Sequence, residues 1–341
     1  MKHSSILLAF FTLYLLSSCA KQKQYYEVTG MLHTPYQIKF EYTESLEDEI
    51  SAELQRYYHC LNPFDSTSVI SQVNQNKDIE VDDLFIEVFN KAMEVSGQTN
   101  GIYDITCAPF INLWGFGFSK SDSVTPAMID SIRPFVGYQK VRLEGRKVIK
   151  DDPRLLLNCS SLGDGCCCEV IARLFDSKGI ENYLIDIGGE TTAKGVNPKG
   201  ECWHVGITRP SDDPMGTNKE LQVILLLCGR HGLATSGDYR NFYIKDGKKY
   251  AHTIDPTAGY PIESDVLSAT IIAPNCALAD ALATASMVLG SSEALRLCEQ
   301  QQGVECLLLV SDRQEPEGFR MVKTSGMDAY IKEVEANNDT K

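Results

Sequence analysis

Two short segments carry residue types whose spacing could support chemistry. His252 precedes Asp255 by three residues, in a turn rich in proline and glycine. A carboxylate beside an imidazole can orient the ring and make it more basic, as a general base requires. A lone exposed histidine at the end of a hairpin is the alternative. This segment therefore supplies a candidate base.

The second segment is Asp280-Ala281-Leu282-Ala283-Thr284, within an otherwise apolar run. Positions i and i+4 share one face of a helix, so the carboxylate and the hydroxyl would point the same way. A buried carboxylate is costly unless it is paired or bound to a metal, and hard oxygen ligands suit Mg²⁺. A hydrogen bond within the helix is the alternative interpretation.

Two further segments combine small residues with polar or aromatic ones. Tyr103-Asp104-Ile105-Thr106 is followed by Asn112 to Gly117, where glycines flank Trp114 and Phe116. This pattern indicates either backbone bending around a flat ligand or an aromatic corner of the core. Residues 158–165 are interpreted as a strand-to-helix turn that could bind an anion, or as a tight turn capped by Asp164.

Hydrophobic periodicity predicts the elements that must position these residues. Helices are expected at 44–61, 82–97, 125–134, 165–178, 275–289 and 292–301. Strands are expected as a pair within 25–42 and at 183–187, 203–208, 222–228, 268–273 and 306–311. A hairpin is expected at 242–253, turning at Asp246-Gly247.

The composition is that of one folded, acidic protein. The 341 residues are 43% hydrophobic and carry a net charge of −14, which disfavours nucleic acid as a partner. Neither GxGxxG nor GxxxxGK[ST] occurs, and helices do not alternate regularly with strands. The sequence predicts an α+β fold with mixed, largely antiparallel sheets and packed helices.

The N-terminus predicts export. Lys2 precedes an apolar run from Ile6 to Leu16 that is too short to span a bilayer, as in a signal peptide. Leu16-Ser17-Ser18-Cys19 matches a bacterial lipobox, in which the cysteine is lipidated; a plain secretory signal is the alternative. We expect a signal at 1–18, a lipidated linker at 19–24, one catalytic unit at 25–332 and a polar tail at 333–341. The protein would face the periplasm, anchored to a membrane through Cys19.

The other cysteines show no paired spacing typical of zinc sites. Buried packing is the expected role of the isolated ones, Cys60, Cys107, Cys202, Cys228, Cys276, Cys298 and Cys306. Cys166, Cys167 and Cys168 are consecutive, and we expect unusual packing on the first turn of a helix.

Taken in order, these segments resemble the ApbE family of flavin transferases over about residues 26–327. The resemblance is carried by Ser68-x-x-Ser71-x-x-Asn74, Tyr103-Asp104-Ile105-Thr106 with Leu113 to Gly117, Ile187-Gly188-Gly189, Ser236-Gly237-Asp238-Tyr239, His252-x-x-Asp255-Pro256-x-x-Gly259 and Asp280-x-x-x-Thr284. It implies a T-fold-like catalytic unit and transfer of FMN from FAD to a Thr or Ser hydroxyl of an acceptor protein, with release of AMP. The acceptor would carry an FMN-binding domain, of the type found in redox-pump subunits.

The resemblance also implies roles for individual residues. Asp280 and Thr284 would hold Mg²⁺ through their side chains and Ser161 through its carbonyl, and His252 would be the base. Contacts with FAD would come from Leu32, Phe64, Ile102, Tyr103, Asp104, Asn158, Asp164 and Ile254.

The chain departs from the family pattern at several of these positions. Leu32-His33-Thr34 replaces the usual Met-Gly-Thr, Phe64 replaces a tyrosine and Asn158 replaces an aspartate. Asp164 stands where the family has lysine or glutamate, so its contact with the nucleotide would be altered. Two alternatives to transfer are Mg²⁺-dependent hydrolysis of FAD to FMN and AMP, and non-catalytic FAD binding at a membrane.

Overall fold

A large antiparallel sheet organises the computed structural model, which describes residues 22–117, 123–210, 220–237, 242–245 and 248–332. Its strand order is β1-β2-β5-β6-β9-β14-β15-β16, and each neighbouring pair in the described chain is antiparallel. The predicted α+β fold with mostly antiparallel sheets is confirmed. The strands are β1 (Gln24–Met31), β2 (Pro35–Tyr42), β5 (Tyr183–Ile187), β6 (Glu190–Lys194), β9 (His231–Gly237), β14 (Val266–Ala273), β15 (Glu305–Ser311) and β16 (Phe319–Lys323).

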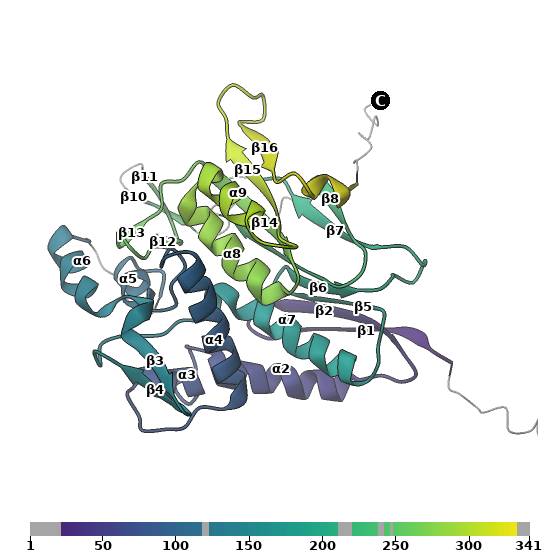
Figure 1. Ribbon diagram of the computed structural model, residues 1–341, viewed down its shortest axis with the longest axis horizontal. Coiled ribbons are helices and arrows are strands. Elements are labelled where there is room, and N and C mark those ends of the chain that lie inside the picture. The colour runs from purple at the N-terminus through teal and green to yellow at the C-terminus, as the bar shows by residue number, and fades with distance from the viewer. Residues whose placement is uncertain (1–21, 118–122, 211–219, 238–241, 246–247, 333–341) are drawn as a thin grey trace, which may run out of the picture.

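Helices cover one face of this sheet (Figure 1). Helices α7 (Ser160–Ser177), α8 (Cys276–Leu289) and α9 (Ser291–Glu299) contact its strands. Helix α2 (Glu47–Leu61) packs on α7, α4 (Asp83–Gln98) on α8 and α2, and α3 (Val69–Asn74) on α2. Local sequence sets several of their starts: Asp82 caps α4 by accepting from Phe85 N, and Asn275 caps α8 by accepting from Leu278 N. The largest hydrophobic core lies between these helices and the sheet.

A small sheet covers the opposite face. It has the order β17-β8-β7, with β7 (Trp203–Thr208), β8 (Leu221–Leu227) and β17 (Ile331–Lys332). Alternation along β15 separates the two cores: Leu308 joins the helical core, whereas Leu307 and Leu309 join the core under the small sheet. Side chains of a strand point alternately to its two faces, so the large sheet is buried on both.

A third, smaller core holds the edge of the molecule near α5 (Ala108–Leu113) and α6 (Pro126–Ile132). Phe110 and Ile129 pack there with Ile254 of β12 (Ile254–Asp255), which pairs with β13 (Tyr260–Pro261). The other short elements are the hairpins β3 (Val141–Glu144) with β4 (Lys147–Lys150) and β10 (Phe242–Lys245) with β11 (Lys248–Ala251), and single 3₁₀ turns at Arg133–Phe135, Tyr138–Lys140 and Met327–Ala329.

Most predicted elements lie within a few residues of the observed ones, with one substantial error. The helix predicted at 165–178 begins at Ser160, so residues 160–165 are helix and the predicted strand-to-helix turn is wrong. The predicted hairpin at 242–253 ends at Ala251. Several predicted features lie outside the described residues. They are the hairpin turn at Asp246-Gly247, the Asp238-Tyr239 part of the family motif, the signal peptide with Cys19, and the tail at 333–341. None of the helices described here is long and apolar enough to cross a membrane.

Candidate active site

Helices α7 and α8 approach each other closely at Gly165. A Cβ atom at this position would lie 2.6 Å from the carbonyl oxygen of Cys276 and 2.8 Å from Cβ of Asp280. Only glycine fits such a contact without displacing backbone. The approach lets the amide of Gly165 donate a 3.1 Å hydrogen bond to Oδ2 of Asp280.

The predicted metal ligands meet across this helix contact. Thr284 Oγ1 donates to the carbonyl oxygen of Ser161 at 3.4 Å, and Asp280 accepts from α7, so both side chains of α8 face α7. Asp280 and Thr284 each bond a residue of α7, in place of the alternative hydrogen bond between them within α8. Ser161, Asp280 and Thr284 together offer a carbonyl, a carboxylate and a hydroxyl oxygen.

This donor set fits a hard cation. Burial raises the pKa of Asp280 to about 7, and burial together with Asp280 and Asp164 raises the pKa of Glu190. Crowded carboxyl groups with this behaviour would be relieved by a bound positive charge. In the described ranges, no group of three or more His, Cys, Asp or Glu side chains could hold a metal ion.

A cavity opens beside the same turn of α7. Its volume is about 200 Å³, and it is lined by His33, Tyr57, Tyr58, Leu61, Asn62, Pro63, Phe64, Cys159, Ser160, Gly163 and Asp164. Two predicted FAD contacts, Phe64 and Asp164, lie on its wall, and the Phe64 side chain is 71% exposed. Tyr57 OH donates to the carbonyl oxygen of Gly163 at 2.7 Å and holds the turn in place.

His33 and Asp164 form an ion pair on this cavity wall. His33 Nε2 lies 2.7 Å from Oδ1 of Asp164, and the imidazole stacks on Tyr58 with ring centroids 5.7 Å apart. The hydrogen bond to Asp164 raises the pKa of His33 above its usual value. Two departures from the family pattern are therefore in direct contact, and the Asp164 carboxylate is already engaged within the protein.

The predicted FAD contacts Asn158 and Asp104 are each hydrogen-bonded within the protein. Asn158 N donates to the carbonyl oxygen of Ile105, and its side chain accepts from Ser160 N. The Asp104 carboxylate accepts from the amide and hydroxyl of Thr106 and from Tyr138 N, while burial raises its pKa.

Three further predicted contacts are partly or fully enclosed. Tyr103 is 1% exposed and accepts from Ser161 Oγ. Leu32 and Ile102 are half-buried against the main core. Contacts from Tyr103 and Asp104 would therefore use backbone atoms, because their side chains are enclosed and hydrogen-bonded.

The candidate base His252 immediately precedes the β12–β13 hairpin. Phe116 meets the imidazole edge-on, with ring centroids 6.5 Å apart. Asp255 Oδ1 accepts from the amide and hydroxyl of Thr257 and from the amide of Ala258, so this carboxylate organises the turn. The predicted FAD contact Ile254 is 5% exposed in the third core.

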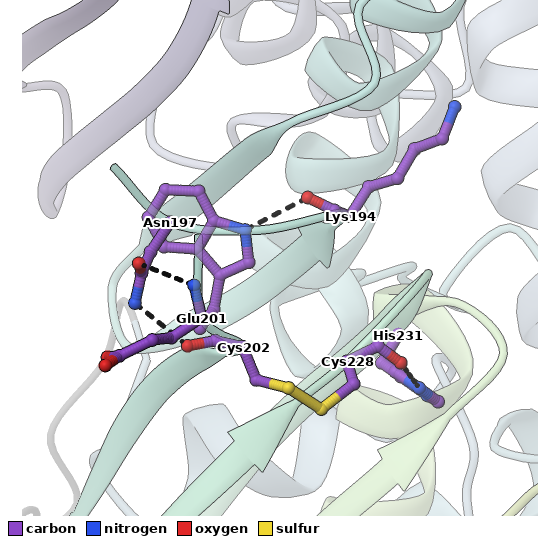
Figure 2. Close-up of a disulfide and its surroundings, with 7 residues drawn as sticks. Lys194, Asn197, Glu201, Cys202, Cys228 and His231 are labelled. Atoms are coloured by element: carbon purple, nitrogen blue, oxygen red, sulfur yellow. Dashed lines mark hydrogen bonds between the residues drawn. A yellow bond between two sulfur atoms is a disulfide. The ribbon is translucent and has the colours of Figure 1, made fainter. Parts of the chain in front are cut away.

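The cysteines divide into one disulfide and nine buried thiols in the described residues. Cys202 and Cys228 are bonded, next to the paired ends of β7 and β8 (Figure 2). The prediction of free, packed thiols is wrong for this pair and confirmed by burial for the other five isolated cysteines. The run Cys166–Cys168 is buried, but it lies in the second turn of α7 because the helix begins earlier than predicted.

Several cavity residues were missed from the sequence. Tyr57 lies in the apolar stripe of α2, so its periodicity indicated core packing and concealed its hydroxyl contact. His33 gave no signal, because its partner Asp164 is 131 residues away. Its position beside the Leu32 contact was the one available clue.

Comparison with known proteins identifies the class to which this fold and site belong. The ApbE family model matches residues 32–308, and solved flavin transferases share the fold. The Vibrio cholerae flavin transferase ApbE aligns with a TM-score of 0.78 and 31% identity, covering 90% of this chain and 99% of that one. The apo flavinyl transferase ApbE of Pseudomonas stutzeri aligns with a TM-score of 0.79 and 29% identity, covering 92% and 98%.

Relatives found by sequence similarity are also flavin transferases. A Vibrio cholerae FAD:protein FMN transferase is 32% identical over 337 residues, covering 95% of this chain and 98% of the relative. The Salmonella typhimurium FAD:protein FMN transferase is 33% identical over 284 residues, covering 81% and 79%. The chain belongs to the ApbE family.

Proposed function

We propose that this protein transfers FMN from FAD to a Thr or Ser hydroxyl of an acceptor protein, releasing AMP, and that the reaction requires Mg²⁺. The observation that carries the proposal is the set of contacts made by residues 160–165 at the start of α7. Ser161 and Gly165 there are hydrogen-bonded to Thr284 and Asp280 of α8, and Ser160, Gly163 and Asp164 line the cavity that also contains Phe64. A cation and a nucleotide would thus be held next to each other by adjacent residues at the start of one helix.

The residues have distinct tasks in this proposal. Asp280, Thr284 and the carbonyl of Ser161 would hold Mg²⁺, which supplies neutralisation of the charge that develops at the transferred phosphate. His252 would accept the proton of the acceptor hydroxyl as that oxygen attacks. The protein otherwise contributes position, since phosphoryl transfer needs little covalent chemistry from side chains.

One incubation separates this function from its two rivals. The purified protein is mixed with FAD, Mg²⁺ and an acceptor that has an FMN-binding domain, and the products are resolved by gel fluorescence and chromatography. Transfer gives a covalently fluorescent acceptor with AMP in equal amount. Free FMN with an unlabelled acceptor would indicate FAD hydrolysis, and tight FAD binding without either product would indicate a flavin-binding protein. An acceptor lacking its Thr or Ser is the control.

We also propose export and lipid anchoring at Cys19. The Cys202–Cys228 disulfide supports export, because disulfides persist in oxidising compartments outside the cytoplasm. Metabolic labelling with a palmitate analogue should mark the wild-type protein in the membrane fraction and leave Cys19→Ser unlabelled. Label on both proteins would contradict anchoring at Cys19. The acceptor of a protein anchored there would be an exported or membrane-bound flavoprotein, of the redox-pump type.

A further inference from the structure

The hairpin that follows His252 is closed by its own backbone. Ile262 N donates to the carbonyl oxygen of Thr253 at 3.1 Å, and Gly259 N donates to that of Asp255 at 2.7 Å. Between these bonds the pairing of β12 with β13 fixes the register. The hairpin is therefore a small rigid unit, and His252 lies at its start. Whatever fixes this unit on the body of the protein also fixes the imidazole.

Three successive carbonyl groups of the turn accept hydrogen bonds from outside it. The Arg133 guanidinium donates to the carbonyl oxygens of Thr257 at 2.5 Å and of Ala258 at 2.9 Å. Trp114 Nε1 donates to the carbonyl oxygen of Gly259 at 2.8 Å. Arg133 follows α6 and Trp114 follows α5, so two separate elements hold the same turn.

An apolar contact directs the same turn into the α5–α6 region. Gly259 has a φ of +77°, and a Cβ atom there would lie 2.8 Å from Ile129 and 2.9 Å from Phe110. The Tyr260 ring tilts against Trp114, with ring centroids 5.8 Å apart. The turn therefore enters a socket that excludes a side chain, and the three carbonyl bonds fix its direction within that socket.

We propose that Arg133 and Trp114 are positioning residues that fix His252 for proton transfer. This inference rests on the proposed function, in which His252 is the base. A guanidinium presents a planar fork of donors and can satisfy two neighbouring carbonyls at once, whereas an ammonium is a single compact donor. Displacing a reacting group by about 1 Å can cost about 100-fold in rate. Loss of the clamp should therefore lower turnover and leave FAD binding on the α7 side unaffected.

The test measures FAD affinity by flavin fluorescence, and kcat and KM for acceptor labelling, in the full-length protein. The variants are Arg133→Ala, Arg133→Lys, Trp114→Phe, His252→Ala and the double variant Arg133→Ala/His252→Ala. Arg296→Ala is the matched control, because its guanidinium binds only Glu293 one turn earlier on α9 in the described structure. Circular dichroism melts check that each variant is folded.

We expect Arg133→Ala to lower kcat about 10- to 100-fold with a much smaller change in FAD affinity, because Ile254 is the one predicted FAD contact in this hairpin. Arg133→Lys should recover part of the loss. Trp114→Phe should lower kcat about 2- to 10-fold, as removal of one neutral hydrogen bond would. The double variant should be no slower than His252→Ala, since the clamp acts through the imidazole. Arg133→Ala with wild-type kcat, or a double variant slower than His252→Ala, overturns the inference while leaving the proposed function standing. If His252→Ala labels the acceptor at the wild-type rate, His252 is not the base. Its role in the proposed function and the positioning role of Arg133 and Trp114 would then both be wrong.

Discussion

The two sides of the candidate site are held in different ways. The α7–α8 side is set by burial: Gly165 lets two helices touch, and Asp280 lies within their contact. The His252 side is set largely by directional bonds of one turn: Arg133 and Trp114 donate to its carbonyl groups, and Asp255 accepts bonds within it. Changes on the first side should therefore act on stability and chemistry together. Changes on the second should act on chemistry with little effect on stability.

Asp280→Asn should give the largest effect. It keeps the shape and an acceptor for Gly165 N but removes the charge that would hold Mg²⁺, so labelling should fall below detection at limiting Mg²⁺. The metal-free variant should be more stable than the wild type at pH 8. Burial raises the folded-state pKa of Asp280 from 3.8 to about 7, so its ionisation opposes folding increasingly as pH rises between these values. The gain is about 1.4 kcal/mol for each unit of that rise.

Melts at pH 4 and pH 8 with EDTA measure this difference, which should shrink towards pH 4. Unchanged labelling at limiting Mg²⁺ would sink the metal assignment.

Gly165→Ala should cost about 1–3 kcal/mol of unfolding free energy, because the new methyl group collides with the backbone of α8. Gly163→Ala is the matched control two residues earlier on α7, where the nearest atom to an added Cβ is Tyr57 OH at 3.9 Å. That change should be neutral or stabilise by up to about 1 kcal/mol, since alanine favours helix over glycine. Urea unfolding of both variants measures the difference, and equal free energies would contradict the close helix contact.

Asp255→Ala tests the other side. It removes the acceptor of three bonds that shape the turn, so labelling should slow about 10-fold or more while the melting temperature changes little. Asp312→Ala is the control, because Asp312 also accepts an amide bond two residues on, from Gln314, in an exposed turn. Its labelling rate should match the wild type. A large loss of stability in Asp255→Ala would show that the hairpin is part of the folding core.

The smallest effect concerns the His33–Asp164 pair. The folded-state pKa of His33 is raised above 6.5, so the pair stabilises the protein fully below pH 6.5 and loses its contribution as pH rises through the raised value. Because the His33 side chain is 43% exposed, the effect should be only a small shift in melting temperature. His33→Gln should therefore melt below the wild type at pH 5.5 and coincide with it at pH 9. A difference independent of pH would assign the loss to ring stacking on Tyr58.

The sequence predicted the elements that have strong hydrophobic periodicity. It did not predict those whose formation depends on tertiary contacts. Helices α2 and α4 were found from their apolar stripes, and α8 from its alanine-rich sequence. The first turn of α7 was interpreted as a loop because glycine and serine are weak helix formers, but packing against α8 at Gly165 overrides that preference.

Contacts between distant residues explain the remaining errors. The Cys202–Cys228 disulfide joins residues 26 apart that share no paired-cysteine motif. Strands β6, β9 and β16 of the large sheet were not predicted at all, and β6 follows two glycines with positive φ. The order of motifs indicated which residues could act, whereas the way in which Arg133 and Trp114 hold the His252 hairpin required the structure.

The most direct test of the account is the mass of an acceptor protein after incubation with this protein, FAD and Mg²⁺. We predict a gain equal to one FMN less one water, located on a single Thr or Ser by peptide mapping, with wild-type protein and not with Asp280→Asn or His252→Ala. An unmodified acceptor beside accumulating free FMN, or an equal mass gain with all three proteins, would contradict it.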